Sequence, residues 1–95
     1  MKAYLILDFA ITDMGRFAEY IQNIPAHIAK HSGKYIVRGS EPTVMEGDWK
    51  PERVVVIEFP ARANAEQFLQ DPEAESLFEI RHKATISKLI LVDGE

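Results

Sequence analysis

Residues 53–59 read Arg-Val-Val-Val-Ile-Glu-Phe (RVVVIEF), which is the strongest strand signal in the chain. Branched and aromatic side chains at this density are typical of β-strands. Before it, residues 47–51 (GDWKP) predict a turn and residues 34–38 (KYIVR) predict another strand. Two strand signals joined by a loop containing Gly and Pro predict a β-hairpin. We expect residues 43–46 to prolong the first strand of this hairpin after a bulge.

The segments on either side of the hairpin complete a recognisable order of elements. Residues 3–9 (AYLILDF) and 86–92 predict strands. An apolar stripe from Met14 to Ile24 predicts a helix that is capped by Thr12 or Asp13 and ends at a left-handed Gly33. Residues 64–70 and 71–84 predict a pair of helices, the second opened by the sequence Asp-Pro-Glu. This βαββαβ order predicts one α+β domain over residues 1–95, a ferredoxin-like fold with a four-stranded antiparallel sheet.

The predicted strands carry apolar side chains on both of their faces. Alternation places Leu5 and Leu7 on one face but Tyr4 and Ile6 on the other, and residues 54–57 and 89–92 repeat this pattern. Helices on one side of a sheet cover only one face, and each exposed large aliphatic side chain forgoes about 1.5–3 kcal/mol of burial. We therefore expect a homodimer that pairs its sheets. The alternative is a monomer with an exposed apolar sheet.

Composition limits the class of protein. The chain has 95 residues, of which 46% are hydrophobic and 27% are charged, a balance typical of soluble globular proteins. Its net charge of −4 argues against a nucleic-acid partner, and no apolar run is long enough to cross a membrane. Without a signal peptide in view, we expect a cytoplasmic location. The chain has no cysteine, which excludes thiol chemistry, and it lacks glycine-rich phosphate loops, so we expect no cofactor.

Three charged residues interrupt the apolar strands, namely Asp8, Arg38 and Glu58. A charge inside a buried strand is costly unless it is paired or solvated, so each marks either a sheet edge or a binding site. Arg38 precedes the flexible Gly39-Ser40 pair and is suited to binding a carboxylate or another anion. Glu58 is the candidate for acid–base chemistry, with solvent exposure at a strand end as the alternative for it and for Asp8.

The segment Glu46-Gly47-Asp48-Trp49-Lys50-Pro51-Glu52-Arg53 has an unusual composition. A hairpin turning near Trp49 sets Glu46 opposite Arg53 as a cross-strand ion pair. A tryptophan that is fully exposed in a turn leaves a large apolar surface in contact with water, which is unfavourable. Trp49 is therefore expected to cover a pocket mouth or the partner subunit. The alternative is a purely structural latch. Tyr20, beside the helical stripe, is a further candidate for presenting a hydroxyl group to a ligand.

His27 and His31 are four residues apart, so on a helix they share one face and can together bind a metal ion. The sequence offers no third ligand nearby, so we expect no metal site. We interpret both as exposed histidines near the C-terminal end of a helix, where their charge suits the helix dipole.

The pattern of several short motifs resembles a known family. The motifs are Ala3-Tyr4, Arg38-Gly39, the EGxWxPxR signature of residues 46–53, Glu58-Phe59-Pro60, Asp71-Pro72-Glu73 and Arg81. Together they resemble the domain-of-unknown-function family numbered 1330, which belongs to the dimeric α/β-barrel superfamily. The resemblance implies that two subunits close a dimeric α/β barrel. It also implies that ligands lie in the cleft between each sheet and its helices.

Two functions follow as expectations from these observations. The first is a homodimer that binds a small organic or anionic molecule, with Arg38, Trp49, Arg53, Glu46 and Tyr20 as candidate ligand contacts. The resemblance implies that such a site can carry cofactor-independent monooxygenase- or isomerase-like activity, for which Glu58 and Arg38 are the catalytic candidates. The second is a non-catalytic structural or regulatory dimerisation domain, with the segment 46–53 purely architectural.

Overall fold

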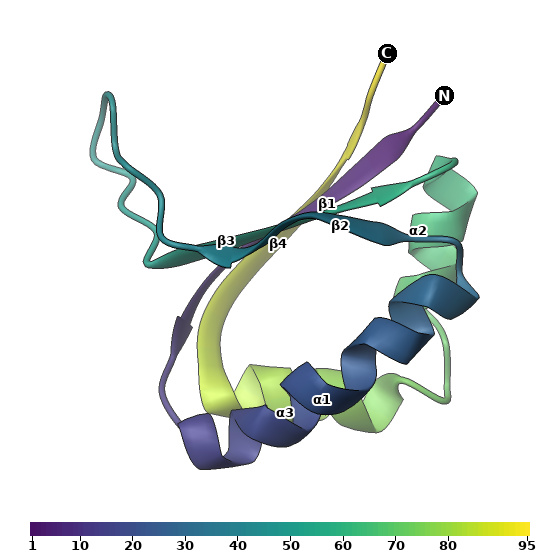
Figure 1. The fold of residues 1–95 in the computed structure, drawn as a ribbon, viewed down its shortest axis with the longest axis horizontal. Coiled ribbons are helices and arrows are strands. Elements are labelled where there is room, and N and C mark those ends of the chain that lie inside the picture. Colours follow the sequence, from purple (N-terminus) through teal and green to yellow (C-terminus); the bar gives the residue numbers. More distant parts are fainter.

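The order of strands and helices agrees with the sequence-based prediction. The computed structural model describes residues 1–95 throughout. The elements are β1 (Ala3–Ile11), α1 (Met14–Lys30), β2 (Lys34–Ser40), β3 (Arg53–Phe59), α2 (Arg62–Leu69), α3 (Glu75–Ala84) and β4 (Thr85–Asp93). The four strands form one antiparallel sheet in the order β2-β3-β1-β4, and the helices lie on one side of it (Figure 1). This confirms the ferredoxin-like βαββαβ fold.

The longest helix, α1, begins where its capping residue predicts. The Asp13 Oδ1 accepts a hydrogen bond from the Arg16 backbone N–H at 3.1 Å. Its end differs from the prediction, because Ser32 rather than Gly33 adopts the left-handed conformation, with φ of 67°. The Gly33 N–H bonds the carbonyl of Ile28 at 2.9 Å, which closes a Schellman motif around Ser32. Gly33 is needed for close packing, since an added Cβ would lie 2.7 Å from the Phe59 ring.

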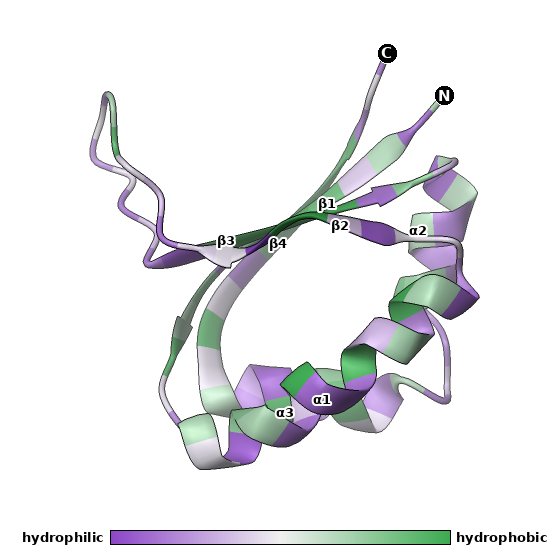
Figure 2. Cartoon of the chain, in the orientation of Figure 1, coloured by the Kyte–Doolittle hydropathy of each residue, from purple (hydrophilic) through white to green (hydrophobic).

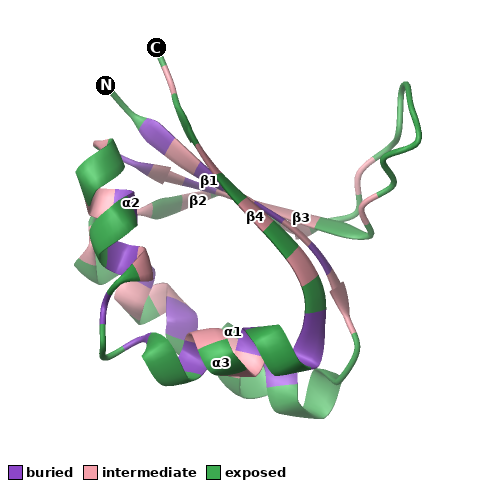
Figure 3. Ribbon diagram, turned by 180° about the vertical axis from the view of Figure 1, so that it is seen from behind, coloured by how far each residue is buried: buried purple, intermediate pink, exposed green.

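The two faces of the sheet differ in their cover, as the strand alternation predicts. Under the helices, Leu5, Leu7, Phe9, Ile57 and Phe59 are buried and form the core. On the other side, which we call the outer face, the large apolar residues that are exposed are Ile36 (50% exposed), Ile86 (72%), Ile90 (57%) and Val92 (44%). Figure 2 shows that hydrophobic residues dominate the central strands. Figure 3 shows buried and intermediate residues alternating along β1, and intermediate and exposed residues alternating along β4. A large apolar surface thus remains uncovered.

The connection between β2 and β3 is longer than predicted. Residues 41–52 form no strand, so the expected continuation over residues 43–46 is wrong. Figure 1 shows this loop projecting on the side of the sheet away from the helices. Its length separates Glu46 from Arg53, and the expected ion pair between them is absent. Instead, the Arg53 Nη1 donates a hydrogen bond to the carbonyl oxygen of Gly39 at 3.4 Å.

Asp71 does not begin the last helix as predicted, and its carboxylate holds a cluster of polar contacts instead. Helix α3 begins at Glu75, and Asp71 lies in the preceding turn with its side chain buried. The Asp71 carboxylate accepts hydrogen bonds from Lys30 at 2.9 Å and from the Glu73 N–H at 2.9 Å, and it lies 2.7 Å from His31 Nε2. His31 is therefore a largely buried partner of Asp71 rather than an exposed residue as predicted. This cluster ties the end of α1 to the turn before α3.

None of the three helices is both long and apolar enough to pass through a membrane.

Candidate ligand-binding site

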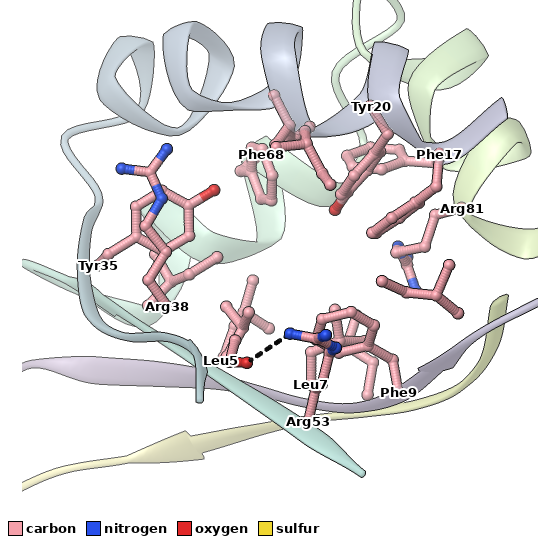
Figure 4. A pocket seen from close by; sticks show the side chains of 18 of the residues that line it. Leu5, Leu7, Phe9, Phe17, Tyr20, Tyr35, Arg38, Arg53, Phe68 and Arg81 are labelled. Atoms are coloured by element: carbon pink, nitrogen blue, oxygen red, sulfur yellow. Dashed lines mark hydrogen bonds between the residues drawn. The ribbon is translucent and has the colours of Figure 1, made fainter. Parts of the chain in front are cut away.

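A cavity of about 260 Å³ separates α1 from the covered face of the sheet. Sixteen of its twenty lining residues are hydrophobic, so its interior is apolar. Its aromatic lining consists of Phe9, Phe17, Tyr20, Tyr35, Phe68 and Phe78. In Figure 4 the labelled aromatic side chains converge from the sheet below and the helices above, namely Phe9, Phe17, Tyr20, Tyr35 and Phe68. The remaining polar side chains of the lining are three arginines.

Alternation along β1 supplies the floor of the cavity. Leu5, Leu7 and Phe9 all point toward the helices, because side chains two residues apart share one face of a strand. Helix α1 supplies the opposite wall through Phe17, Tyr20 and other residues one helical turn apart. The Phe17 and Tyr20 rings stack with their centroids 5.0 Å apart. The cavity is thus framed by two elements that are fixed in the core.

An irregularity in β2 brings Tyr35 and Arg38 to the same side of the sheet. Strict alternation would separate residues three apart, but the pairing with β3 shifts by one residue between Tyr35 and Val37. As a result the Arg38 guanidinium lies over the Tyr35 ring, 4.4 Å from its centroid. A second shift follows between Arg38 and Ser40, where Gly39 has a φ of 83°. Both side chains line the cavity.

Three arginines line the cavity, and no aspartate or glutamate does. Arg38 and Arg53 are exposed to solvent, whereas Arg81 is only 6% exposed. Figure 4 shows Arg81 across the cavity from Arg38 and Tyr35. A chain with a net charge of −4 therefore concentrates positive charge at this one apolar site.

The two tyrosines of the cavity keep their hydroxyl protons. Burial raises the pKa of Tyr20 to about 12, and the neighbouring positive charge of Arg81 opposes this effect only in part. Burial also raises the pKa of Tyr35, against the charge of Arg38. Both hydroxyls are therefore neutral hydrogen-bond donors at neutral pH rather than bases.

The cavity brings together three of the residues that the sequence singles out, namely Arg38, Arg53 and Tyr20. Glu46 and Trp49 do not line it, because their loop projects from the opposite side of the sheet. The Trp49 indole Nε1 instead donates a hydrogen bond to Asp8 Oδ2 at 2.7 Å. Asp8 is thus partnered rather than merely exposed at a strand end.

Glu58 also does not line the cavity, so its predicted acid–base role stays a prediction that this cavity does not support. Its carboxylate is 3.2 Å from the Lys2 ammonium group and 3.6 Å from that of Lys34. Partial burial raises the pKa of Glu58, but the contacts with these two cations lower it by more. The net pKa of Glu58 is therefore below its ordinary value. Glu58 is therefore an ion-paired carboxylate on the outer face.

Arg81 and Tyr35 are site residues that the sequence-based reasoning did not assign. Helical spacing sets Arg81 on one side of the helix with Leu77 and Phe78, and a charge on an apolar helix side is the signal that marks it. The structure places this side of α3 against the sheet and the cavity.

The protein is similar in fold to several solved structures. A protein of unknown function from Rhodopseudomonas palustris superimposes with a TM-score of 0.79 at 17% identity, over 99% of this chain and 82% of that one. A dimeric ferredoxin-like protein of unknown function from Jannaschia sp. CCS1 gives 0.75 at 8% identity, over 99% of this chain and 100% of that one. SnoaB, a cofactor-independent oxygenase from Streptomyces nogalater, gives 0.68 at 14% identity, over 99% of this chain and 93% of that one.

No functionally curated protein matches the sequence. The family described as a domain of unknown function, DUF1330, matches residues 2–95. The match extends over nearly the whole chain, including residues 38–39 and 46–53. The chain therefore belongs to the DUF1330 family.

Proposed function

We propose that this chain binds a small, largely apolar organic molecule in the cavity between α1 and the sheet, and that it does so as a homodimer. The observation that carries the proposal is the cavity itself, with its 260 Å³ of space and its mostly hydrophobic lining. Small-molecule sites in proteins have this character, with apolar walls and a few convergent polar groups.

The incomplete packing of the cavity walls supports a ligand. Apolar side chains that face the empty cavity lack the van der Waals contacts that they would have in a filled core. A ligand that fills the space restores the lost van der Waals contacts to residues such as Leu7, Phe17 and Leu89. The chain keeps the cavity although larger side chains at the same positions would close it.

The residues that line the cavity favour ligand binding over catalysis by the protein's own side chains. It contains no carboxylate, imidazole or thiol, and both of its tyrosines stay protonated at neutral pH. A catalytic form of the proposal is cofactor-independent oxygenation or isomerisation, and the similarity in fold to SnoaB supports it by analogy only. In that form the substrate ionises readily and the arginines stabilise its anion.

The homodimer accounts for the outer face. Ile36, Ile86 and Ile90 are at least half exposed there, and a second copy of the same face would cover them. The similar protein from Jannaschia is described as dimeric, which supports this arrangement. In the competing proposal, a non-catalytic dimerisation domain, the outer face is the only functional surface.

The experiment is isothermal titration calorimetry with 2-naphthamide, a neutral aromatic probe. We expect saturable binding that is abolished by Val55→Phe, which places a ring inside the cavity, and retained by Ala63→Phe on the exposed side of α2. Melting temperatures establish that both variants are folded. Binding that is unaffected by Val55→Phe would refute the cavity as the site, and the absence of binding to the wild type would favour the pure dimerisation domain.

A further inference from the structure

Arg81 is a buried cation without an anionic partner. It projects from α3 and is 6% exposed, yet it takes part in none of the ion pairs of the structure. Its Nη1 donates to Ser87 Oγ at 3.2 Å, and its Cζ lies 5.9 Å from the centroid of the Phe78 ring. These neutral contacts do not balance its charge. Buried charges in proteins are normally paired, because their removal from water is costly.

The Arg81 guanidinium group has more donors than the chain satisfies, with the side chains of Ser87 and Tyr20 as its hydrogen-bonding neighbours. A guanidinium group carries five N–H donors, and Ser87 accepts from one of its nitrogens. No fully buried side-chain nitrogen in the protein lacks a hydrogen-bond partner, so the other Arg81 nitrogens retain accessible surface. Because Arg81 lines the cavity, that surface is the surface a bound molecule would meet (Figure 4).

The rest of the lining determines what kind of molecule fits beside this charge. No carboxylate of the chain lines the cavity to compete for Arg81, and the surrounding walls are aromatic and aliphatic. A guanidinium group binds a carboxylate through two parallel hydrogen bonds, which are stronger in an apolar site than in water. The chemistry therefore combines one anion-binding group with an apolar body.

We propose that the cavity selects an apolar monocarboxylate, such as an aromatic acid, whose carboxylate pairs with Arg81. This inference rests on the proposed binding function and names the class of ligand. The neutral Tyr20 hydroxyl, near enough to be influenced by the Arg81 charge, is a second donor for the same carboxylate. Arg38 and Arg53 are solvent-exposed and serve to attract the acid to the cavity rather than to anchor it.

The test compares 2-naphthoate with its neutral amide, 2-naphthamide, by calorimetry at neutral pH. We expect the wild type to bind the acid at least about tenfold more tightly than the amide. Arg81→Met, which keeps the apolar stem, should abolish this preference while the amide still binds, and Arg81→Lys should restore part of it. Arg62→Met, on the exposed side of α2, is the matched control and should leave the preference unchanged.

A second measurement requires no variant. In the wild type, the side-chain Nε–H resonance of Arg81 should shift on addition of 2-naphthoate and not of 2-naphthamide. Equal binding of acid and amide by the wild type, or a preference that survives Arg81→Met and is lost in Arg38→Met, would overturn Arg81 as the anchor. Either result would leave the cavity as a binding site. If the wild type binds neither compound, that result would instead contradict the proposed function.

Discussion

The Trp49 indole Nε1 donates a hydrogen bond to Asp8 Oδ2 at 2.7 Å, which joins the long loop between β2 and β3 to the neighbouring strand β1. Asp8 pairs with Val54 and Lys88 across the sheet and lies on its outer face. The contact thus holds residues 41–52 beside the surface for which a second copy is proposed. Within the family signature, the loop residues up to position 52 thus have a structural role away from the cavity, whereas Arg53 lines it.

Trp49→Phe tests this contact, because it removes the donor and keeps an aromatic ring. We expect the free energy of unfolding to fall by about 1 kcal/mol in urea denaturation, since the hydrogen bond is charge-assisted but exposed. In an Asp8→Ala background the same substitution should cost nothing further, which isolates the pair from the ring's other contacts. A Trp49→Phe protein as stable as the wild type would show that the contact contributes nothing in solution.

Ile90→Lys tests the outer face as the dimer interface. Ile90 is 57% exposed in the single chain, and in a symmetric dimer one substitution changes both halves of the interface. Light scattering on the size-exclusion peak should give a dimer for the wild type and a monomer for Ile90→Lys at micromolar concentration. Ala18→Lys, on the exposed side of α1, should remain dimeric. A monomeric wild type would contradict the proposed assembly.

Gly33→Ala should destabilise the protein by about 1–3 kcal/mol, the usual cost of overpacking a core. An added Cβ would lie 2.7 Å from the Phe59 ring and 2.9 Å from the Ile28 side chain. Gly15→Ala is the control, because its Cβ would meet only Asp13 at 3.6 Å and should stabilise α1 by about 0.5–1 kcal/mol. Thermal unfolding of the two variants measures both effects, and equal melting temperatures would refute the packing argument.

Asp71→Asn tests the cluster that joins α1 to the turn before α3. Hydrogen bonds from His31 and Lys30, followed by the Glu73 N–H, hold the pKa of Asp71 well below its ordinary value. A carboxyl group whose pKa is lowered by folding stabilises the native state above its unfolded pKa of about 4, and this stabilisation is lost as the pH falls toward the folded pKa. The wild type should therefore lose stability below about pH 4.

The substituted protein should be less stable at neutral pH and should show a weaker loss in acid, as measured by urea unfolding across this pH range. Glu73→Gln is the control, because the Glu73 side chain is 71% exposed and its substitution should change the profile little. An Asp71→Asn protein with the acid profile of the wild type would show that other carboxyl groups account for the pH dependence.

The sheet faces were predictable because side chains in a regular strand alternate. This rule places Leu5 and Leu7 in the core and Ile90 outside, as the structure confirms. It fails in β2, where the register shift between Tyr35 and Val37 brings Tyr35 and Arg38 to the same face. Such bulges depend on pairing with β3, which the sequence of β2 alone does not determine.

The candidate site was predictable only in part, for a similar reason. Arg38, Arg53 and Tyr20 line the cavity, but Trp49 and Glu58 lie on the other side of the sheet, because their positions depend on the loop path and on strand register. Arg81 escaped assignment because a helix with an amphipathic pattern does not show which neighbours surround a charge on its apolar side. Its partners, Ser87 and Phe78, become visible only in the packed structure.

The most direct test of the central claim is an NMR measurement of nuclear Overhauser effects between 2-naphthamide and the methyl groups of the protein. The cavity account predicts contacts to Leu7 and Leu89, which line the cavity under the helices. Contacts confined to Ile86 and Ile90, on the exposed outer face, would contradict it, because the probe would then bind where the second copy is proposed.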